Sequence, residues 1–167
     1  MTMDLTKIQA GPCQLTWGGT NLGHTQDGVE FNYEPDIRER VVDKYGSSPV
    51  ELILIGERVT VVARLTQWEL AKMKAAIPAG LQGSDYLGIG RIAGFHLRRE
   101  EAEELVIHPL EQATTQYDVT LWKTVASAPI TIGYTHDGDR VFEVTFFALQ
   151  DESKMDGQTI GKIGSPS

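Results

Sequence analysis

The side chains that most often carry out chemistry, histidine and cysteine, are few in this chain of 167 residues. No two histidines have the His-x-x-x-His spacing that places two metal ligands on one helical face; they lie at His24, His96, His108 and His136. His108 precedes Pro109 at a predicted strand end, which favours a structural role. His136, next to Asp137 and Asp139, could bind a cation, but a solvated hairpin turn explains the same residues more simply.

Other catalytic signatures are equally weak. The single cysteine, Cys13, excludes an internal disulfide and a cysteine-rich metal site, and no histidine lies near it in the sequence. A buried structural thiol is therefore favoured over a nucleophile. The segment GIGRIAG, residues 88–94, lacks the strand–loop–helix frame of a nucleotide-binding loop. No G-x-S-x-G or Walker motif occurs. The sequence predicts no enzyme, no metal and no cofactor.

Composition indicates one folded domain. Hydrophobic residues make up 41% and charged residues 23% of the chain, which is ordinary for a globular protein. The net charge of −8 argues against general affinity for nucleic-acid phosphates. No apolar run approaches the roughly 20 residues of a membrane span, and residues 1–11 lack the apolar core of a secretory signal. We therefore expect synthesis in the cytoplasm and no membrane association.

The elements that must position any site are mostly strands. About nine are predicted, around one packed helix at residues 66–77, where Thr66 and Glu69 have capping-box spacing. Extended segments are expected at 29–34 and 37–43, with Pro35 between them at a bend or a sheet edge. A turn is expected at residues 46–49, followed by strands at 50–55 and 58–66 joined at Gly56–Glu57. The later strands are predicted at 91–98, 104–108, 117–125, 129–135 and 140–149, the last two joined by a hairpin turn at 136–139.

Residues 50–65 are apolar on both faces of an extended chain. Val50, Leu52 and Leu54 point one way, whereas Ile53 and Ile55 point the other. A strand with one face in water alternates apolar with polar residues, so this pattern predicts a sheet that is covered on both sides. The cover can come from the chain itself or from a neighbouring molecule.

The succession of segments resembles the tail tube proteins of long-tailed bacteriophages, which are related to the tubes of contractile injection systems. The resemblance covers roughly residues 11–150 in order and rests on spacing, without a single catalytic signature. The segments that carry it are GPCQLTWGGTNLG, GVEFNYE, VVDKYGSSPVELILIGERVTVVARLTQWELAKM, LVIHPL, LWKTVA and RVFEVTFFAL.

The resemblance implies a mainly β fold, a β-sandwich or partial barrel flanked by one helix. It implies hexameric rings whose inner sheets join into a continuous barrel, and rings that stack into the tail tube through which DNA passes to the host cell. On this interpretation residues 1–11 form an N-terminal arm, residues 12–150 the tube domain and residues 151–167 a C-terminal arm. The implied location is the virion tail.

A channel that DNA slides through should have a polar, largely acidic wall, because carboxylates repel phosphates. The alternation of residues 29–34 and of residues 142–146 places polar side chains opposite buried ones. The resulting channel-lining candidates are Glu30, Asn32, Glu34, Glu143 and Thr145. The plainer alternative is that these residues simply face solvent.

The resemblance also implies contacts between rings through a long hairpin loop and the terminal arms. Exposed charge pairs add little affinity but set register. The candidates for stacking and inter-subunit contacts are Asp43, Lys44, Tyr45, Ser47, Ser48, Pro49, Arg98, Arg99, Glu100 and Glu101. Expected partners are further copies of the chain, the tape measure, tail-tip and terminator proteins, and DNA as transient cargo.

Three other functions fit the sequence. The chain can be the tube protein of a contractile or type VI secretion-like system, or a tail terminator ring that caps a tube. In a different class, it can be a small β-barrel binding protein with a pocket lined by Trp17, Trp122 and Tyr134. That last function predicts a monomer and a tightly bound small molecule.

Overall fold

The computed structural model describes residues 11–23, 25–77, 83–90, 102–111, 114–126, 129–130, 132 and 141–164. Within these ranges the chain is mainly β, with one α-helix and two short 3-10 helices. The elements in chain order are β1 (Cys13–Trp17), β2 (Thr20–Asn21), β3 (Thr25–Val41), η2 (Asp43–Tyr45), β4 (Pro49–Leu65), α1 (Leu70–Ala76), β5 (Glu103–Pro109), η4 (Thr115–Tyr117), β6 (Val119–Ala126), β7 (Phe142–Leu149) and β8 (Gly161–Ile163).

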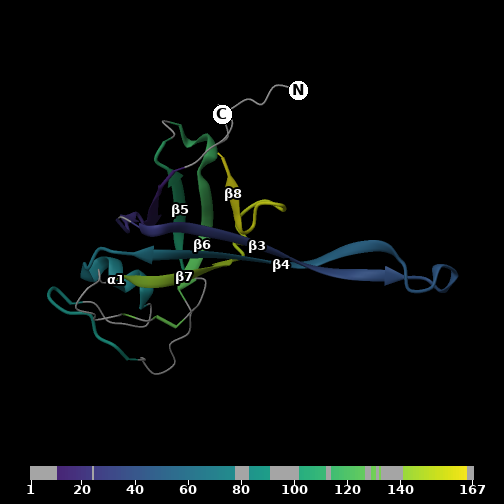
Figure 1. Ribbon diagram of the computed structural model, residues 1–167, viewed down its shortest axis with the longest axis horizontal. Helices are drawn as coiled ribbons and strands as arrows, with labels where there is room; N and C mark the ends of the chain where they lie inside the picture. The colour runs from purple at the N-terminus through teal and green to yellow at the C-terminus, as the bar shows by residue number, and fades with distance from the viewer. Residues whose placement is uncertain are drawn as a thin grey trace.

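The strands form one antiparallel sheet that curls over itself without closing (Figure 1). The order is β2-β1-β5-β6-β7-β4-β3, and β8 pairs with β6 beside this path. Strands β1, β5 and β6 form one layer, and β7, β4 and β3 form the other. The expected β-sandwich or partial barrel with a single flanking helix is therefore confirmed.

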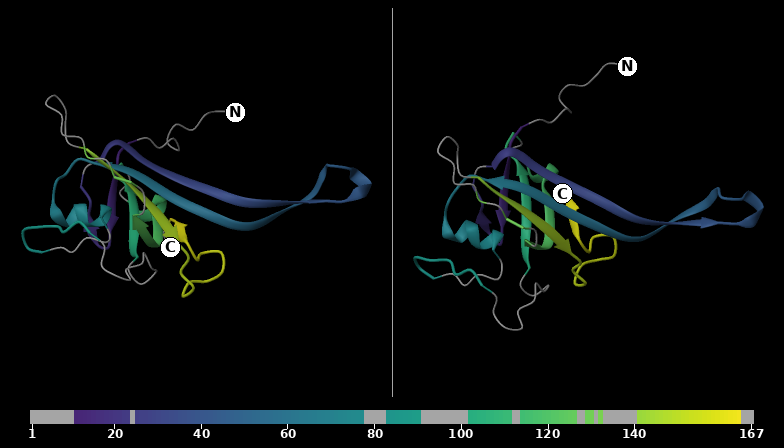
Figure 2. Two further views of the ribbon diagram at one scale, coloured as in Figure 1. Left: turned by 90° about the horizontal axis from the view of Figure 1, so that it is seen from below. Right: turned by 60° about the horizontal axis from the view of Figure 1, so that its bottom comes forward.

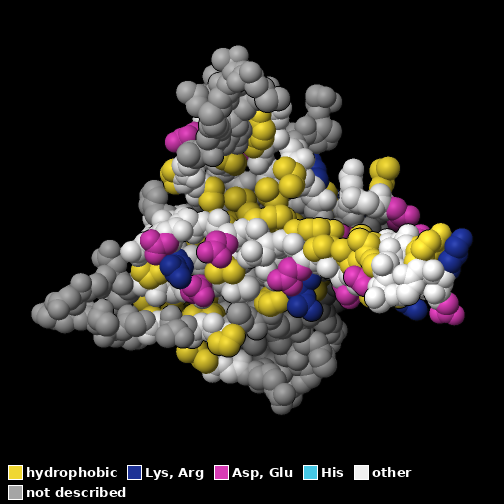
Figure 3. Space-filling model, turned by 45° about the vertical axis from the view of Figure 1, so that its right-hand side comes forward, with side chains coloured by type: hydrophobic (Ala, Val, Ile, Leu, Met, Phe, Trp, Pro, Cys, Tyr) yellow, Lys and Arg dark blue, Asp and Glu magenta, His cyan; other side chains and the backbone are white. Residues whose placement is uncertain are grey.

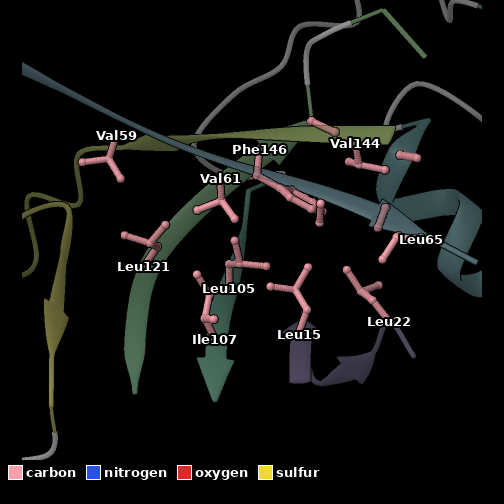
Figure 4. Packing of buried hydrophobic residues seen from close by; sticks show 14 of the residues in the cluster. Leu15, Leu22, Val59, Val61, Leu65, Leu105, Ile107, Leu121, Val144 and Phe146 are labelled. Carbon is pink, nitrogen blue, oxygen red and sulfur yellow. The ribbon is translucent and has the colours of Figure 1, made fainter. Parts of the chain in front are cut away.

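The core lies between the two layers (Figure 4). Side chains from β1, β5 and β6 point toward those from β4 and β7, as period-2 alternation requires. Phe142, Val144 and Phe146 are 0–1% exposed, as their alternation with Glu143 and Thr145 predicts. The central members of the cluster are Leu15, Leu22, Val59, Val61, Leu65, Leu105, Ile107 and Leu121.

Strands β3 and β4 are 17 residues each and form one long hairpin that projects from the body (Figures 1 and 2). The sequence predicts each as two shorter strands, broken near Pro35 and at Gly56–Glu57, and this was wrong. Pairing continues through both points, because Pro35 pairs with Glu57 and Asp36 with Gly56. A proline is tolerated there because β3 is at the sheet edge and pairs only with β4 among the described strands. The predicted turn at 46–49 is confirmed, after η2.

The helix is shorter than predicted and begins without the expected capping box. It starts at Leu70, and the N-cap is Glu69, which is extended and makes no capping hydrogen bond from its side chain. The Glu69 carboxylate instead accepts a hydrogen bond from Lys72 Nζ at 3.0 Å. Trp68 packs edge-on against Phe142, with ring centroids 6.1 Å apart. Tertiary packing of this segment thus replaces the first helical turn that spacing predicted.

The predicted strands at 104–108, 117–125 and 140–149 correspond to β5, β6 and β7, with ends shifted by a few residues. The predicted strand at 91–98 and the turn at 136–139 lie outside the described residues, as does most of 129–135.

Residues 151–164 pack on the same sheet in this protomer. Strand β8 pairs with β6, and Ile160 joins the core at 7% exposure. Asp151 is buried and accepts hydrogen bonds from the backbone N–H and the hydroxyl of Ser153. The division of the chain into two arms and a central domain stays a prediction.

Candidate functional site

The five predicted channel-lining residues share one face of the β3-β4-β7 layer. Directly paired residues in antiparallel strands present their side chains on the same face. Glu30 pairs with Val62, and Val62 pairs in turn with Thr145. The same register applied to the remaining pairs places Asn32, Glu34 and Glu143 on this face, opposite the core-facing Val59, Val61 and Ala63. We call this surface the polar face. Its members are Glu30, Asn32, Glu34, Thr60, Val62, Glu143 and Thr145 with Arg58 and Arg64, bordered by Asp27, which forms an ion pair with Arg64, and by Phe147, which pairs with Thr60.

The two arginines on the polar face are held by carboxylates. Arg64 Nε donates to Glu143 Oε2 and Arg64 Nη1 to Asp27 Oδ2, each at 3.0 Å. The hydrogen bond to Glu143, followed by that to Asp27, raises the pKa of the Arg64 guanidinium. Arg58 lies 3.9 Å from Glu34. The polar face therefore keeps a net negative charge, with Asp27, Glu30, Glu34 and Glu143 against two guanidinium groups.

Sequence reasoning missed Arg58 and Arg64 as members of this face. The signal was present, because both alternate with the apolar series Val59, Val61, Ala63 and Leu65 on β4. The same series identifies Thr60 and Val62 as their neighbours. A strand predicted to be apolar on both faces thus carries a polar stripe beside the core.

The distal part of the hairpin, residues 36–56, is exposed along its length, apart from the intermediate Ile53 and Gly56. A bulge lies between Asp36 and Ile37, where the pairing moves from Asp36–Gly56 to Ile37–Leu54 and leaves Ile55 without a direct partner. The extra residue moves Leu54 and Leu52 onto the face that Tyr33 and Val59 occupy nearer the core. The core-facing side of the hairpin therefore continues toward the tip as a mainly apolar face, which Glu57 and Glu39 interrupt.

We call the apolar residues of that distal face, Ile37, Leu52 and Leu54, the ridge. Their exposed fractions are 47%, 61% and 56%. Single exposed apolar side chains are common on protein surfaces. The ridge differs because its three apolar side chains are adjacent on one face, and a contiguous apolar patch often marks an interaction site.

The stacking candidates on the hairpin lie at its tip. Asp43, Lys44 and Tyr45 form η2, which Gly46 ends with a φ of 63°. The Tyr45 ring is 56% exposed and lies 5.5 Å from Lys44 Nζ. Ser47, Ser48 and Pro49 follow and are all exposed. The four charged candidates at 98–101, Arg98, Arg99, Glu100 and Glu101, lie outside the described residues.

His108 and Cys13, two of the residues whose types could do chemistry, make contacts that indicate a structural role. His108 Nδ1 lies 2.6 Å from Asp118 Oδ1 and so joins the end of β5 to the start of β6. Cys13 is a half-buried free thiol, and this burial raises its pKa, which disfavours the reactive thiolate. Among the described residues, no cluster of three or more histidine, cysteine, aspartate or glutamate side chains is arranged to hold a metal ion.

The aromatic residues of the predicted ligand pocket are far from equivalent. Trp17 packs on Phe146, with ring centroids 6.3 Å apart, and its Nε1 donates to the Thr124 hydroxyl at 3.1 Å. Trp122 donates to the Gln158 carbonyl at 2.7 Å, and Lys154 Nζ lies 4.2 Å from its ring centroid. The third residue, Tyr134, lies outside the described part of the chain.

In the part of the chain that the structure describes, no helix is both long and apolar enough to span a membrane. No protein-family model matches the sequence, and no curated protein matches it. Among solved structures, the chain is similar to one in the "Virion of native gene transfer agent (GTA) particle". The two are 11% identical with a TM-score of 0.48, and the match covers 84% of this chain and 93% of that one. A likeness at this level carries no conclusion about function.

Proposed function

We propose that this protein is a structural virion protein, the tail tube protein of a long-tailed phage or a related tail-like particle. Six copies form a ring, and rings stack into the tube through which DNA passes to the host cell. The observation that carries the proposal is the projecting hairpin, whose ridge is apolar and uncovered in a single copy. The order and spacing of the sequence segments, which resemble tail tube proteins, supply the kind of assembly.

Burying the ridge against a neighbouring copy is thermodynamically favourable. Fully burying a leucine or isoleucine side chain contributes about 1.5–3 kcal/mol, so each half-exposed residue gains on the order of 1 kcal/mol from a cover. Ile37, Leu52 and Leu54 are three such residues in each copy. Repeated around a ring, this gain favours assembly over the free protomer.

The edge of the sheet gives a second reason. Strand β3 pairs only with β4 among the described strands, so one side of a 17-residue strand presents unpaired backbone groups. Long open edges promote pairing with other chains unless they are covered. In the proposed ring, the β3 edge pairs with the neighbouring subunit, and the sheets join into a closed barrel.

In the proposed tube the polar face lines the channel. Glu30, Asn32, Glu34, Glu143 and Thr145 then face the DNA, and their carboxylates repel its phosphates and prevent adhesion. The ion pairs of Arg64 and Arg58 support this role, because a guanidinium bound to a carboxylate is less available to a phosphate. The chain performs no catalysis in this proposal and is located in the virion tail, with tape measure, tail-tip and terminator proteins as partners.

The test is negative-stain electron microscopy of the purified protein, together with its mass in solution. Stacked rings or hollow tubes with six-fold symmetry are expected. Isolated rings that never stack would instead indicate a terminator-like protein. A protein that remains monomeric at high concentration, even with a tail-tip initiator, would overturn the proposal and favour a ligand-binding function.

The channel assignment has its own test. Glu30→Lys and Glu34→Lys introduce cations on the polar face, where we expect normal tube assembly but impaired DNA delivery. Glu104→Lys, at an exposed residue of β5 in the other layer, is the matched control for added charge. Delivery unaffected by the first two substitutions would show that another face lines the channel.

A further inference from the structure

The structure contains an apolar groove where the hairpin leaves the body. The groove encloses about 310 Å³. The hairpin side of the groove is formed by Phe31, Tyr33, Glu57 and Val59, and its other side by Val119, Leu121, residues 157–160 and β8. Core residues form the floor, since Val59, Leu121 and Ile160 are 4%, 3% and 7% exposed. The mouth is open, since Phe31, Tyr33 and Ile163 are 37%, 50% and 71% exposed.

The groove is open because one layer ends before the other. Strand β8 has only three residues, Gly161–Ile163, and pairs with the first residues of β6. Among the described residues, the layer opposite the hairpin has no strand beyond Ile163, whereas β3 and β4 continue outward for residues 36–56. The hairpin face that forms the core at its base thus becomes a side of the groove and then the uncovered ridge.

The groove and the ridge are successive parts of one ribbon face, on which Pro35 and Glu57 stand between them. By register, Tyr33 and Val59 pair on the face that Ile37 and Leu54 continue after the bulge. Figure 3 shows hydrophobic side chains gathered beside the base of the hairpin and further hydrophobic patches along it, with charged and other side chains between them. Because both parts belong to the same ribbon face, the ridge cannot reach the groove of its own molecule.

We infer that the ridge of one copy of this chain inserts into the groove of the next copy. In one molecule, β6 and β8 cover the apolar face of the hairpin at its base. The groove of the next molecule would cover the same face of the hairpin farther out, at the ridge. The ridge occupies one face of the distal hairpin, residues 36–56, so it offers fewer than the about 20–30 residues that each side of a standard interface contributes, and the β3 edge supplies the rest of the contact. The occupant is a second copy because the ridge requires a face shaped like the chain's own core, and the groove is lined by core residues.

This contact is heterologous, since ridge and groove are different surfaces. Each pairing leaves one free ridge and one free groove, so the contact repeats until it closes a ring or continues as a filament. The inference rests on the proposed function for its occupant and deepens it, because it names the two surfaces that join neighbouring copies.

The test uses two complementary variants. Leu54→Glu disables the ridge and keeps the groove, and Ile163→Glu disables the groove and keeps the ridge. Both residues are more than half exposed in the protomer, so each variant should fold, which thermal unfolding checks. Leu110→Glu, at a half-exposed leucine outside both surfaces, is the matched control and should assemble like the unchanged protein.

Each disabled variant alone should remain a monomer of 18.4 kDa in sedimentation experiments, because the β3 edge pairing of the proposed ring needs the ridge–groove contact beside it. An equimolar mixture should form a dimer and stop there, because only one intact ridge and one intact groove remain per pair. The measured mass should therefore double and rise no further with concentration. A mixture that stays monomeric, while the unchanged protein assembles, would overturn the ridge–groove contact and leave the tube intact.

The opposite outcome separates the two proposals. If the mixture dimerises but the unchanged protein forms solid filaments or unstacked rings, the contact is supported and the tube is wrong. If Leu110→Glu blocks assembly as strongly as Leu54→Glu does, added charge anywhere prevents assembly and the ridge has no special role.

Discussion

The two halves of the β3–β4 hairpin have similar apolar sequences and opposite surroundings. Near the body, Val59, Val61, Ala63 and Leu65 are 0–4% exposed, because β1, β5 and β6 lie across from them. Toward the tip, Leu52, Leu54 and Ile55 are 56–61% exposed, and no described element of the same chain lies across from them. The same residue types therefore stabilise the fold in one half and are available for assembly in the other.

The comparison is tested most strongly by truncating a side chain in the base half. Phe146 is fully buried and pairs with Val61 on the neighbouring strand. Phe146→Ala should therefore lower the free energy of unfolding by about 3–5 kcal/mol. Urea denaturation of the monomer measures this loss. Leu54→Ala is the control in the tip half, where a change within about 0.5 kcal/mol is expected. Equal losses at both sites would contradict the division of roles.

A second substitution disturbs the layer that covers the base half. A Cβ added at Gly161 would lie 2.4 Å from the Thr120 carbonyl oxygen and 2.8 Å from Leu121 Cδ2. Because backbone must shift to relieve this contact, Gly161→Ala should cost about 1–3 kcal/mol and displace β8 from β6. Hydrogen exchange of the β8 amides measures the displacement. Gly157→Ala would test a glycine with open space around it, but its φ of 82° adds strain of a different kind.

A third substitution sharpens the role of the tip half. Leu52→Ala removes ridge surface worth on the order of 1.4 kcal/mol when buried, so the concentration needed for assembly should rise roughly tenfold. Sedimentation across a dilution series measures it. Thermal unfolding of the monomer should change little, since Leu52 is 61% exposed. If Leu52→Ala instead lowered the stability of the monomer and left assembly unchanged, Leu52 would belong to the folded core and not to the assembly surface.

The smallest effect concerns the loop that leads to β8. Hydrogen bonds from the Ser153 hydroxyl and then its backbone N–H hold the pKa of Asp151 below its ordinary value of 3.8. A lowered folded pKa stabilises the protein above the unfolded value, and this contribution is lost as the pH falls through the folded pKa. The stability advantage over Asp151→Asn should therefore be constant near neutral pH and shrink below pH 3.8.

Thermal unfolding between pH 2 and pH 7 measures this dependence, with Asp156→Asn, an exposed residue of the same loop, as the control. A difference between the unchanged protein and Asp151→Asn that grows on acidification would contradict the assignment.

Local alternation in the sequence predicted the faces of individual strands. Phe142, Val144 and Phe146 alternate with Glu143 and Thr145, and burial follows that alternation because side chains in a strand point to opposite faces in turn. Glu30, Asn32 and Glu34 lie opposite Phe31 and Tyr33 for the same reason. Their role in a channel stays a prediction.

The helix and the hairpin were predicted less well. Thr66 and Glu69 have the spacing of a capping box, but Trp68 packs against Phe142 and Lys72 pairs with Glu69, so the helix begins at Leu70. Pro35 was expected at a bend or a sheet edge, and the edge position is confirmed, whereas the break expected at Gly56–Glu57 is absent and a bulge at Ile55 lies beside the glycine. Both errors arise from contacts between residues distant in sequence.

The sequence by itself determined that this chain is a β-rich domain with one helix and that residues 50–65 contain more apolar surface than a half-buried strand needs. Only the tertiary structure decided which part of that surface is core and which is ridge. The reason is that the alternation of side chains between the two faces of a strand depends only on the local backbone. Whether an apolar face is covered depends on where the opposite layer of the sheet ends. Within the described residues that layer ends at Ile163, and the bulge between Asp36 and Ile37 aligns the uncovered residues with the face that the layer leaves open.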